Sequence, residues 1–420
     1  MLPRRQPRHA WSFLERHDVV AIFTLALLLR VVLLVWTGAY REPDPTEAIR
    51  VAHYVVHNGQ FANPYPLAET GPTATVPPGY PYFLSLLMRL AGEGIAFAVL
   101  RCTLAAIAVS AQYALLPGLA QAIGVRRSVG FLGGLAGAAL PIRQWIETAG
   151  GHENAYAGLA LLVLFRLSIP LWSERSWKYA ALCGAAWGAG LLLSPALLPA
   201  MAAVLVVAPW RNRRLLLNSA VAAVGAVAIL VPWTIRNYVA LGALVPMRSS
   251  FGLELAIANS DTATGIETWN MRSWTHPYTQ VAEAEKMRRM GEVAYYAMRK
   301  KQGVDWIRAH PAGFVHLTIL RVVYFWFTPV YGRVKGMFMD LLTAGGILGL
   351  IFLLRARSPH APAMAAIWLL FPLPYYLLHV SPRYRYPIDW MFWLLASYAV
   401  WTLVTEFLQR PSMQRYATTR

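Results

Sequence analysis

Long apolar runs recur along the chain and constrain its fold more than any other feature. Four of them are "VVAIFTLALLLRVVLLVWTG", "AYAGLALLVLFRLSIPL", "LLLNSAVAAVGAVAILVPW" and "MFWLLASYAVWTLVTEF". Each approaches the roughly 20 residues that a helix needs to cross a bilayer. The 420 residues are 57% hydrophobic and 14% charged, whereas soluble domains carry about 25% charged residues. The sequence therefore predicts an all-α polytopic membrane protein.

Basic residues occur as short clusters between the apolar runs. The clusters are Arg4, Arg5, Arg8 and Arg16; Arg126 and Arg127; Arg175 and Lys178; Arg211, Arg213 and Arg214; Arg355 and Arg357; and Arg410 and Arg415. Cytoplasmic loops of membrane proteins carry such clusters, and anionic lipid headgroups attract them. The net charge of +18 therefore indicates membrane lipids as partners and not nucleic acid.

Placing all six clusters on the cytoplasmic side requires an even number of spans between each cluster and the next. About ten transmembrane helices meet this condition. They are expected at 19–38, 95–120, 128–143, 153–171, 179–193, 195–209, 215–235, 337–354, 361–379 and 388–408. The run at 78–90, about 13 residues long, is short for a span. We interpret it as a re-entrant or interfacial helix, and a span remains the alternative.

This topology divides the chain into three parts. Residues 1–235 form an N-terminal transmembrane module of seven spans, with a first outer loop at 39–94 that carries amphipathic helices. Residues 236–336 form a small outer domain of mixed polarity with a helix expected at 279–309, and residues 337–420 form a three-span module. Because both long connections lie on the outer face, we expect the functional site there, on the periplasmic or extracellular side of an inner or plasma membrane.

The first outer loop contains an acid between two prolines. Proline restricts its own backbone and that of the preceding residue, so Asp44 is expected to be held in an extended conformation. Glu47 follows, and apolar positions after Thr46 predict an amphipathic helix on the membrane surface that ends at Gly59. Asp44 would then lie on a rigid bend between a span and this helix. The alternative is that Asp44 only caps a helix or marks the water interface.

A second outer connection carries Arg143, Glu147, His152 and Glu153 at a membrane edge. Its acids are candidates to join Asp44 across the fold. His152 and Glu153 are also metal-ligand types, but neighbouring residues on a helix do not face the same side, and no third ligand has a suitable spacing. No metal site is therefore predicted, and a divalent metal cofactor is left open.

Arginines on the outer side indicate an anionic partner. The run "HVSPRYRYPIDW" places Arg383, Tyr384 and Arg385 in a short outer loop, where arginine is statistically disfavoured. Arg236 follows a span on the same side. Planar guanidinium groups bind phosphate through two parallel hydrogen bonds. Arg383 and Arg385 are therefore predicted to bind a phosphate, with contact to lipid headgroups as the alternative.

An outward-facing acid and phosphate-binding arginines together favour group transfer from a lipid-phosphate donor. The carboxylate would take the acceptor proton, and the arginines would stabilise the leaving phosphate. The alternative is a transporter or flippase of lipid-linked or small solutes, for which repeat symmetry and broken helices are expected. The short spans at 179–209 form a hairpin with a break at Ser194-Pro195, but no matching half exists, which favours the enzyme.

The ordered motifs of the chain resemble a known class of membrane enzymes. They are the Asp of the first outer loop followed by "EAIRVAHYVVHNGQF", then "PPGYPYFLSLLMRL", "PWTIRNYVALGALVPM" and a closing "PRYRYPIDW". Together they are similar to the GT-C class of membrane glycosyltransferases, and within it to the protein O-mannosyltransferase and lipid A aminoarabinose transferase branch (the dolichyl-phosphate-mannose mannosyltransferase-like superfamily). The resemblance implies a GT-C fold and transfer of a hexosyl or pentosyl group from a polyprenyl-phosphate donor to a hydroxyl or amine of a glycan, lipid or protein.

The resemblance also implies roles for individual acids. Asp44 matches the acid of the first outer loop, which would be the catalytic base or orient the acceptor. Glu47 takes the place of a second acid near it. Glu153 matches an acid at the start of the fourth span, although His152 stands where a Ser or Thr is usual.

The closing motif implies the donor site. Arg383, Tyr384 and Arg385 match the "PRYR" element as contacts to the donor phosphate. A lysine sometimes found before the Pro-Pro of the first loop is absent, since Val76 occupies that position. Arg236 or Arg143 would replace that contact.

Overall fold

The computed structural model is helical throughout the residues that it describes. These are 8–41, 46–141, 143, 145–172, 176–207, 213–273 and 275–409. The described residues contain two isolated β-bridges and no longer strand, which confirms the predicted all-α class. The predicted catalytic Asp44 lies between the first two ranges and therefore outside the described residues.

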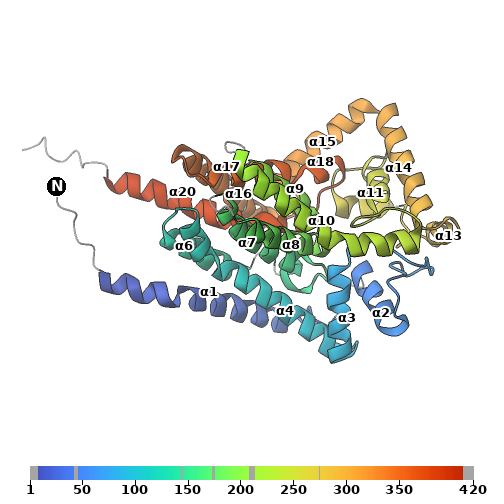
Figure 1. Ribbon diagram of the computed structural model, residues 1–420, viewed down its shortest axis with the longest axis horizontal. Coiled ribbons are helices and arrows are strands. Elements are labelled where there is room, and N and C mark those ends of the chain that lie inside the picture. Colours follow the sequence, from blue (N-terminus) through green and yellow to red (C-terminus); the bar gives the residue numbers. More distant parts are fainter. Residues whose placement is uncertain are drawn as a thin grey trace, which may run out of the picture.

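Six helical stretches of the described residues are long and apolar enough to cross a membrane. They are His17–Thr37 in α1 (Arg8–Thr37), Ile95–Ala122 in α4 (Ile95–Ala114) and α5 (Leu116–Ala122), Asn154–Trp172 in α7 (Asn154–Ser168) with the turn after it, Leu215–Leu241 in α10 (Arg213–Leu241), α16 (Arg333–Arg355), and Pro382–Leu408 in α19 (Pro382–Arg385) and α20 (Asp389–Gln409). In Figure 1, α1 begins and α20 ends at the left-hand end of the long axis. Each stretch overlaps a span expected from the sequence, and the chain is an integral membrane protein.

The four other expected spans correspond to shorter helices. These are α6 (Arg127–Ala139), α8 (Trp177–Leu193), α9 (Leu198–Val207) and α17 (Ala361–Leu370), with 13, 17, 10 and 10 residues. Ten crossings therefore stay a prediction. The outer segment holds a further apolar helix, α15 (Pro311–Trp326), which the sequence analysis did not separate from its mixed surroundings.

The break between α8 and α9 falls at Ser194, whose extended backbone (φ −148°, ψ 105°) ends α8. The helices on the two sides of the break, α8 and α9, have different main neighbours. α8 runs parallel to α10 through close contacts of Gly184 with Ala222 and of Gly188 with Ala226, because small residues let helix backbones approach each other. α9 packs mainly against α17 and also contacts α10. The predicted break is present. The main partner of α8 is α10, and the main partner of α9 is α17.

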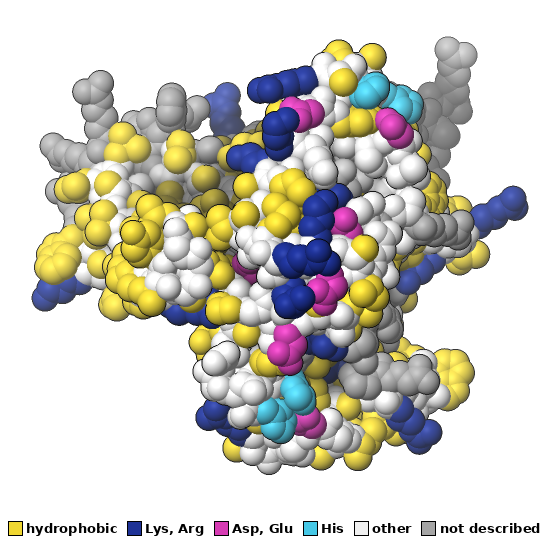
Figure 2. Space-filling view, turned by 90° about the vertical axis from the view of Figure 1, so that its right-hand side faces the viewer, with side chains coloured by type: hydrophobic (Ala, Val, Ile, Leu, Met, Phe, Trp, Pro, Cys, Tyr) yellow, Lys and Arg dark blue, Asp and Glu magenta, His cyan; other side chains and the backbone are white. Residues whose placement is uncertain are grey.

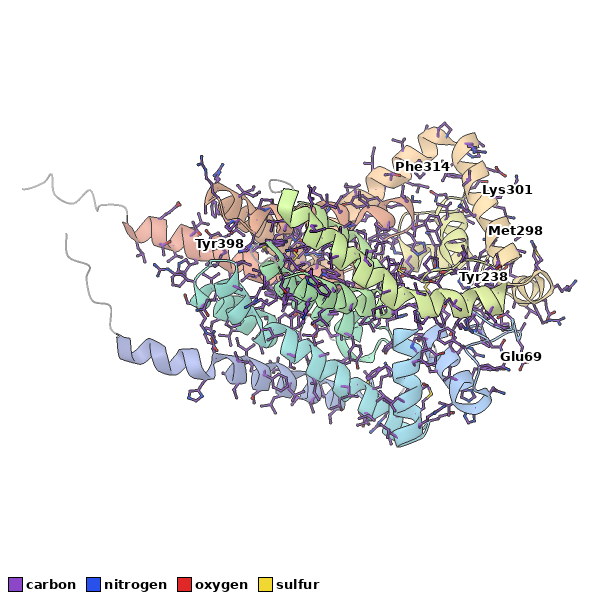
Figure 3. All side chains as sticks on the ribbon, in the orientation of Figure 1. Glu69, Tyr238, Met298, Lys301, Phe314 and Tyr398 are labelled. Atoms are coloured by element: carbon purple, nitrogen blue, oxygen red, sulfur yellow. The ribbon has the colours of Figure 1, made fainter. Side chains whose placement is uncertain are left out.

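One end of the molecule, called the outer end after the predicted topology, gathers the first outer loop (39–94) and the outer segment (236–336). Its helices are α2 (Glu47–Asn58), α3 (Gly79–Ala91), α11 (Phe251–Ala258), α13 (Val281–Met290) and α14 (Glu292–Ala309), at the right-hand end of Figure 1. Figure 3 labels Glu69, Met298 and Lys301 at this end, opposite the half that contains Tyr398. Figure 2 views this end face-on, and side chains of both charge signs gather along its middle.

Two helices of the outer end follow the sequence expectations closely. α2 starts directly after Thr46 and stops at Gly59, whose positive φ of 67° gives the left-handed cap that glycine adopts without strain. Its buried residues are Ala48, Val51, Ala52 and Val55. The helix expected at 279–309 is present in two pieces, because Gly291 separates α13 from α14.

A buried carboxylate ties the first outer loop to the outer segment. Glu292, at the start of α14, accepts hydrogen bonds from the backbone N–H of Ala74 at 2.8 Å and from the hydroxyl of Thr75 at 3.1 Å. It also accepts hydrogen bonds from the hydroxyls of Thr73 and Ser249. Burial of Glu292 raises its pKa. These hydrogen bonds join the first outer loop to the outer segment.

Candidate active site

A cavity of about 330 Å³ lies where the first outer loop, the outer segment and the residues before α20 meet. Its charged and titratable lining residues include Glu47, Glu153, Glu254, Glu267, Arg248, Arg383, His152, His276 and His379. Tyr384 also lines it. Four of the seven residues that the sequence nominated therefore share one cavity, although they are spread over more than 300 positions of the chain. They are Glu47, Glu153, Arg383 and Tyr384.

Backbone pairing brings Glu267 to the closing motif. The N–H of Val380 donates to the carbonyl oxygen of Gly265 at 2.9 Å, and the N–H of Glu267 donates to the carbonyl oxygen of Val380 at 2.9 Å. This short parallel bridge places Glu267, the first residue of α12 (Glu267–Asn270), beside α19. Its carboxylate then forms an ion pair with Arg383, whose Nε lies 3.3 Å from Oε2 and whose Nη2 contacts Oε1.

The charge state of Glu267 follows from these contacts. Burial alone would raise its pKa, but the positive charge and hydrogen bond of Arg383 outweigh burial and hold the pKa of Glu267 at about 2. The hydroxyl of Tyr384 donates to the same carboxylate at 2.9 Å. Glu267 is therefore ionised at neutral pH, and it orients Arg383 and Tyr384 together.

His152 covers the other edge of the Arg383 guanidinium. Nη1 of Arg383 lies 2.9 Å from Nδ1 of His152. Burial and the neighbouring guanidinium lower the pKa of His152 well below its usual value, so this imidazole is neutral at pH 7. Neutral His152 accepts from Arg383 without competing for its anionic partners.

The cavity carboxylates Glu47 and Glu153 come from two different outer connections. The hydroxyl of Thr46, directly before Glu47, donates to the carbonyl oxygen of Gly151 at 3.2 Å, and this bond ties the two connections together. Both carboxylates are partly buried. Burial raises the pKa of Glu47, and a carboxyl group with a raised pKa accepts a proton more readily near neutral pH.

The outer segment adds a second cation that the sequence analysis missed. The Arg248 side chain is 42% exposed and lies 3.8 Å from the Glu254 carboxylate, which is itself 3.5 Å from Nε2 of His379. Nη2 of Arg248 donates to the hydroxyl of Ser250 at 2.5 Å. The one sequence signal for these residues was the acid of "FGLELAIA", since Glu254 interrupts an otherwise apolar helix.

Arg385 points away from the cavity and has structural partners. Its guanidinium lies 3.2 Å from Asp389 and donates to the hydroxyl of Thr343 at 2.8 Å and to the carbonyl oxygen of Trp326 at 2.9 Å. It therefore links α20 to α15 and α16. The predicted phosphate contact at Arg385 stays a prediction, and the reaction proposed below does not use it.

Arg236 also lies outside the cavity lining. It donates to the carbonyl oxygens of Thr73 and Phe61, both at 2.7 Å, and stacks near the rings of Phe61 and Trp233. These contacts fasten the first outer loop to the end of α10. A phosphate role for Arg236 stays a prediction as well.

The remaining charges of the second outer connection pair inside the helix bundle. Nη1 of Arg143 lies 2.7 Å from the Asp389 carboxylate, and Nε of Arg30 lies 3.0 Å from the Glu147 carboxylate. Both pairs are buried. Of the acids on this connection, Glu153 lines the cavity and Glu147 does not.

The acids and histidines of the cavity are residue types that ligate metals. Within the described ranges, its acids and histidines do not bring three ligand atoms within ligand distance of one another, and His152 is engaged with Arg383. Three ligand-type side chains do converge elsewhere, two on α2 and one in the turn between α3 and α4.

Comparisons with known proteins identify the fold. No protein-family model matches the chain, and no curated protein matches its sequence. Solved structures do match. The apo oligosaccharyltransferase of Archaeoglobus fulgidus has a TM-score of 0.59 at 14% identity, covering 95% of this chain and 52% of that one. The chain spans about half the length of this neighbour.

Two further structures of that archaeal enzyme agree. The complex with an inhibitory peptide and a dolichol-phosphate has a TM-score of 0.59 at 14% identity, covering 94% of this chain and 51% of that one. The complex with Zn and sulfate has a TM-score of 0.56 at 13% identity, covering 93% and 49%. These likenesses confirm the GT-C fold that the ordered motifs implied, and the proteins that share it here are membrane glycosyltransferases.

Proposed function

We propose that the chain is an integral membrane glycosyltransferase that moves a sugar from a polyprenyl-phosphate donor to a hydroxyl or amine acceptor. The observation that carries the proposal is the shared cavity. Arg383 and Tyr384 of the closing motif line the same cavity as the carboxylates Glu47 and Glu153. The archaeal neighbour binds dolichol-phosphate, which supports a lipid-linked donor. The cavity lies at the end of the molecule that we assign to the periplasmic or extracellular side.

The donor phosphate is assigned to Arg383 and Tyr384. Glu267 holds the Arg383 guanidinium from one edge, while the Arg383 side chain remains 24% exposed. Positioned donors that need no reorganisation stabilise a charge that develops on a leaving group. Arg248, whose side chain is 42% exposed at the same cavity, is a second cation within the lining for this phosphate.

The reaction is a direct displacement at C1 of the sugar. The acceptor oxygen or nitrogen forms a bond to C1, and the bond between C1 and the phosphate oxygen breaks. The electron pair of the broken bond stays on the polyprenyl phosphate, and the acceptor proton goes to a carboxylate. We assign that carboxylate to Asp44, with Glu47 and Glu153 orienting the acceptor. A single displacement inverts the anomeric centre.

The test is complementation of cells that lack the protein. Mass spectrometry of their lipids and envelope glycans should reveal a missing sugar and an accumulated lipid-linked donor. Wild type should restore the glycan, and so should the control Glu285→Gln, which changes a partly exposed acid of α13 away from the cavity. Asp44→Asn should accumulate to the same level in the membrane and fail to restore it. Full restoration by Asp44→Asn would overturn the base assignment, and an unchanged glycan profile after deletion would overturn the function.

A further inference from the structure

A cluster of metal-ligand side chains lies between α2 and the turn that follows α3, outside the cavity. His53 and His57 are one helical turn apart on the same face, with ring centroids 4.4 Å apart. Glu93 lies in the turn between α3 and α4, where Gly92 with its positive φ of 74° ends α3. Nε2 of His53 lies 3.2 Å from the Glu93 carboxylate, and Nε2 of His57 contacts its other oxygen.

The three ligand atoms already converge. Two imidazole nitrogens and one carboxylate oxygen all lie within 4.8 Å of one another. This donor set is a typical three-ligand set for Zn²⁺, with water or another group in the fourth position. The i, i+4 spacing of the two histidines directs both rings to one side of the helix.

The site is open to solution. The side chains of His53, His57 and Glu93 are 50%, 52% and 37% exposed. The neighbouring Tyr54 donates to exposed Glu69 at 2.6 Å, and Figure 3 labels Glu69 at the outer end. Figure 2 shows two places on this end where histidine and acidic side chains lie next to each other. A divalent ion needs no opening of the fold to enter.

The elements that carry the ligands are fixed independently of any ion. A small core joins α2, α3 and the start of α4. Its buried residues are Ala48, Ala52, Tyr80, Leu84, Leu87, Met88 and Phe97. Because this core sets the distance between α2 and the turn at Glu93, binding an ion costs little rearrangement.

We propose that His53, His57 and Glu93 form a divalent-metal site for an ion of the Zn²⁺ class. The ion would fasten α2 to the connection between α3 and α4. α2 begins at Glu47, so this clamp steadies the helix that carries a cavity carboxylate. The site is separate from the sugar-transfer reaction, and its test does not depend on that function.

The test measures bound metal in the tag-free, detergent-purified full chain. After removal of metal with a chelator and equilibration with Zn²⁺, elemental analysis should find about one more Zn²⁺ per chain in wild type than in the His53→Ala, His57→Ala double variant. Glu93→Gln should weaken Zn²⁺ binding at least about tenfold in chelator competition. The control is a double variant of two exposed histidines elsewhere on the outer segment, His310→Ala and His316→Ala, which should bind as wild type does.

Two further measurements keep the proposal testable if a variant is unstable. Zn²⁺ should raise the melting temperature of wild type and leave that of Glu93→Gln nearly unchanged, since a ligand stabilises only the state that binds it. Co²⁺ bound to wild type should give the visible absorption of a four-coordinate site. Equal Zn²⁺ content in wild type and the His53→Ala, His57→Ala variant would overturn the proposal, and so would a Co²⁺ spectrum that Glu93→Gln does not change.

Discussion

Arg383 and Glu267 form a two-point ion pair across 116 positions of the chain. The pair joins the closing motif before α20 to α12 of the outer segment, and Tyr384 donates to the same carboxylate. The Glu267 side chain is 8% exposed and the Arg383 side chain is 24% exposed. Glu267 is therefore the residue that sets the direction of Arg383 toward the cavity.

The two arginines of the closing motif should behave differently when they are truncated. Arg383→Ala removes a guanidinium that lines the cavity, so affinity for a polyprenyl phosphate should fall about 10-fold to 100-fold. Arg385→Ala removes a buried ion pair and should instead cost about 3–5 kcal/mol of stability. Native mass spectrometry with a polyprenyl phosphate measures the first effect, and thermal unfolding in detergent measures the second. Equal loss of lipid binding in the two variants would contradict the separation of their roles.

Glu47 should make stability depend on pH. Its folded-state pKa is raised above the usual value of 4.5, because burial disfavours the charged form. Its contribution to stability is therefore complete below about pH 4.5 and is lost as the pH rises through its raised pKa. The melting temperature of Glu47→Gln minus that of wild type should accordingly increase from about pH 4.5 upward and then level off. A difference that does not change with pH would refute a raised pKa at Glu47.

Glu267 is the internal control for this experiment, because its pKa is shifted the other way. With a pKa of about 2, its ion pair contributes fully above about pH 4.5 and loses its contribution as the pH falls toward 2. Glu267→Gln should therefore destabilise the protein by a constant amount between about pH 5 and pH 8. The loss of stability caused by Glu267→Gln should become smaller only below about pH 4.5.

Local signals predicted the parts of the fold that depend on local sequence. The helix from Glu47 to Asn58 follows from apolar periodicity and a glycine that ends it, and the break at Ser194 follows from the proline after it. A few neighbouring residues are enough to determine both features. The same holds for most of the membrane helices, whose length and hydropathy identify them.

Pairing between distant segments could not be predicted in this way. Arg236 and Arg383 look alike in the sequence, since each follows or precedes a span on the outer side. The folded chain turns Arg236 toward two carbonyl oxygens of the first outer loop and turns Arg383 into the cavity. Which partner an arginine contacts depends on the path that each loop takes in the folded chain, and the local sequence does not specify that path. The same reason explains why Glu254 and Glu267, in a segment without clear periodicity, were missed.

Arg236 should act as an anchor of the first outer loop. Its guanidinium satisfies the carbonyl oxygens of Phe61 and Thr73 at 2.7 Å, and each hydrogen bond to a charged group contributes about 1.5–3 kcal/mol. Arg236→Gln should lower the melting temperature by several degrees and speed proteolysis of the loop at 60–78. Affinity for polyprenyl phosphate should stay within about twofold. A selective loss of lipid binding without loss of stability would instead favour the phosphate role predicted from the sequence.

The spacing of α16 and α20 should be sensitive to one methyl group. A Cβ added at buried Gly349 would collide with the carbonyl oxygen of Leu395, while the backbone around exposed Gly118 has open space. Overpacking costs about 1–3 kcal/mol, so Gly349→Ala should lower the melting temperature, and Gly118→Ala should leave it unchanged or raise it slightly.

The effect of Gly349→Ala should extend to the cavity. Arg385 donates to Thr343 on α16 from the segment that also carries Arg383, so pushing α16 away from α20 pulls on that segment. Gly349→Ala should therefore weaken polyprenyl phosphate binding although its methyl group lies in the helix bundle. If Gly349→Ala and Gly118→Ala unfold at the same temperature and bind the lipid equally, the close contact between α16 and α20 does not exist in the membrane.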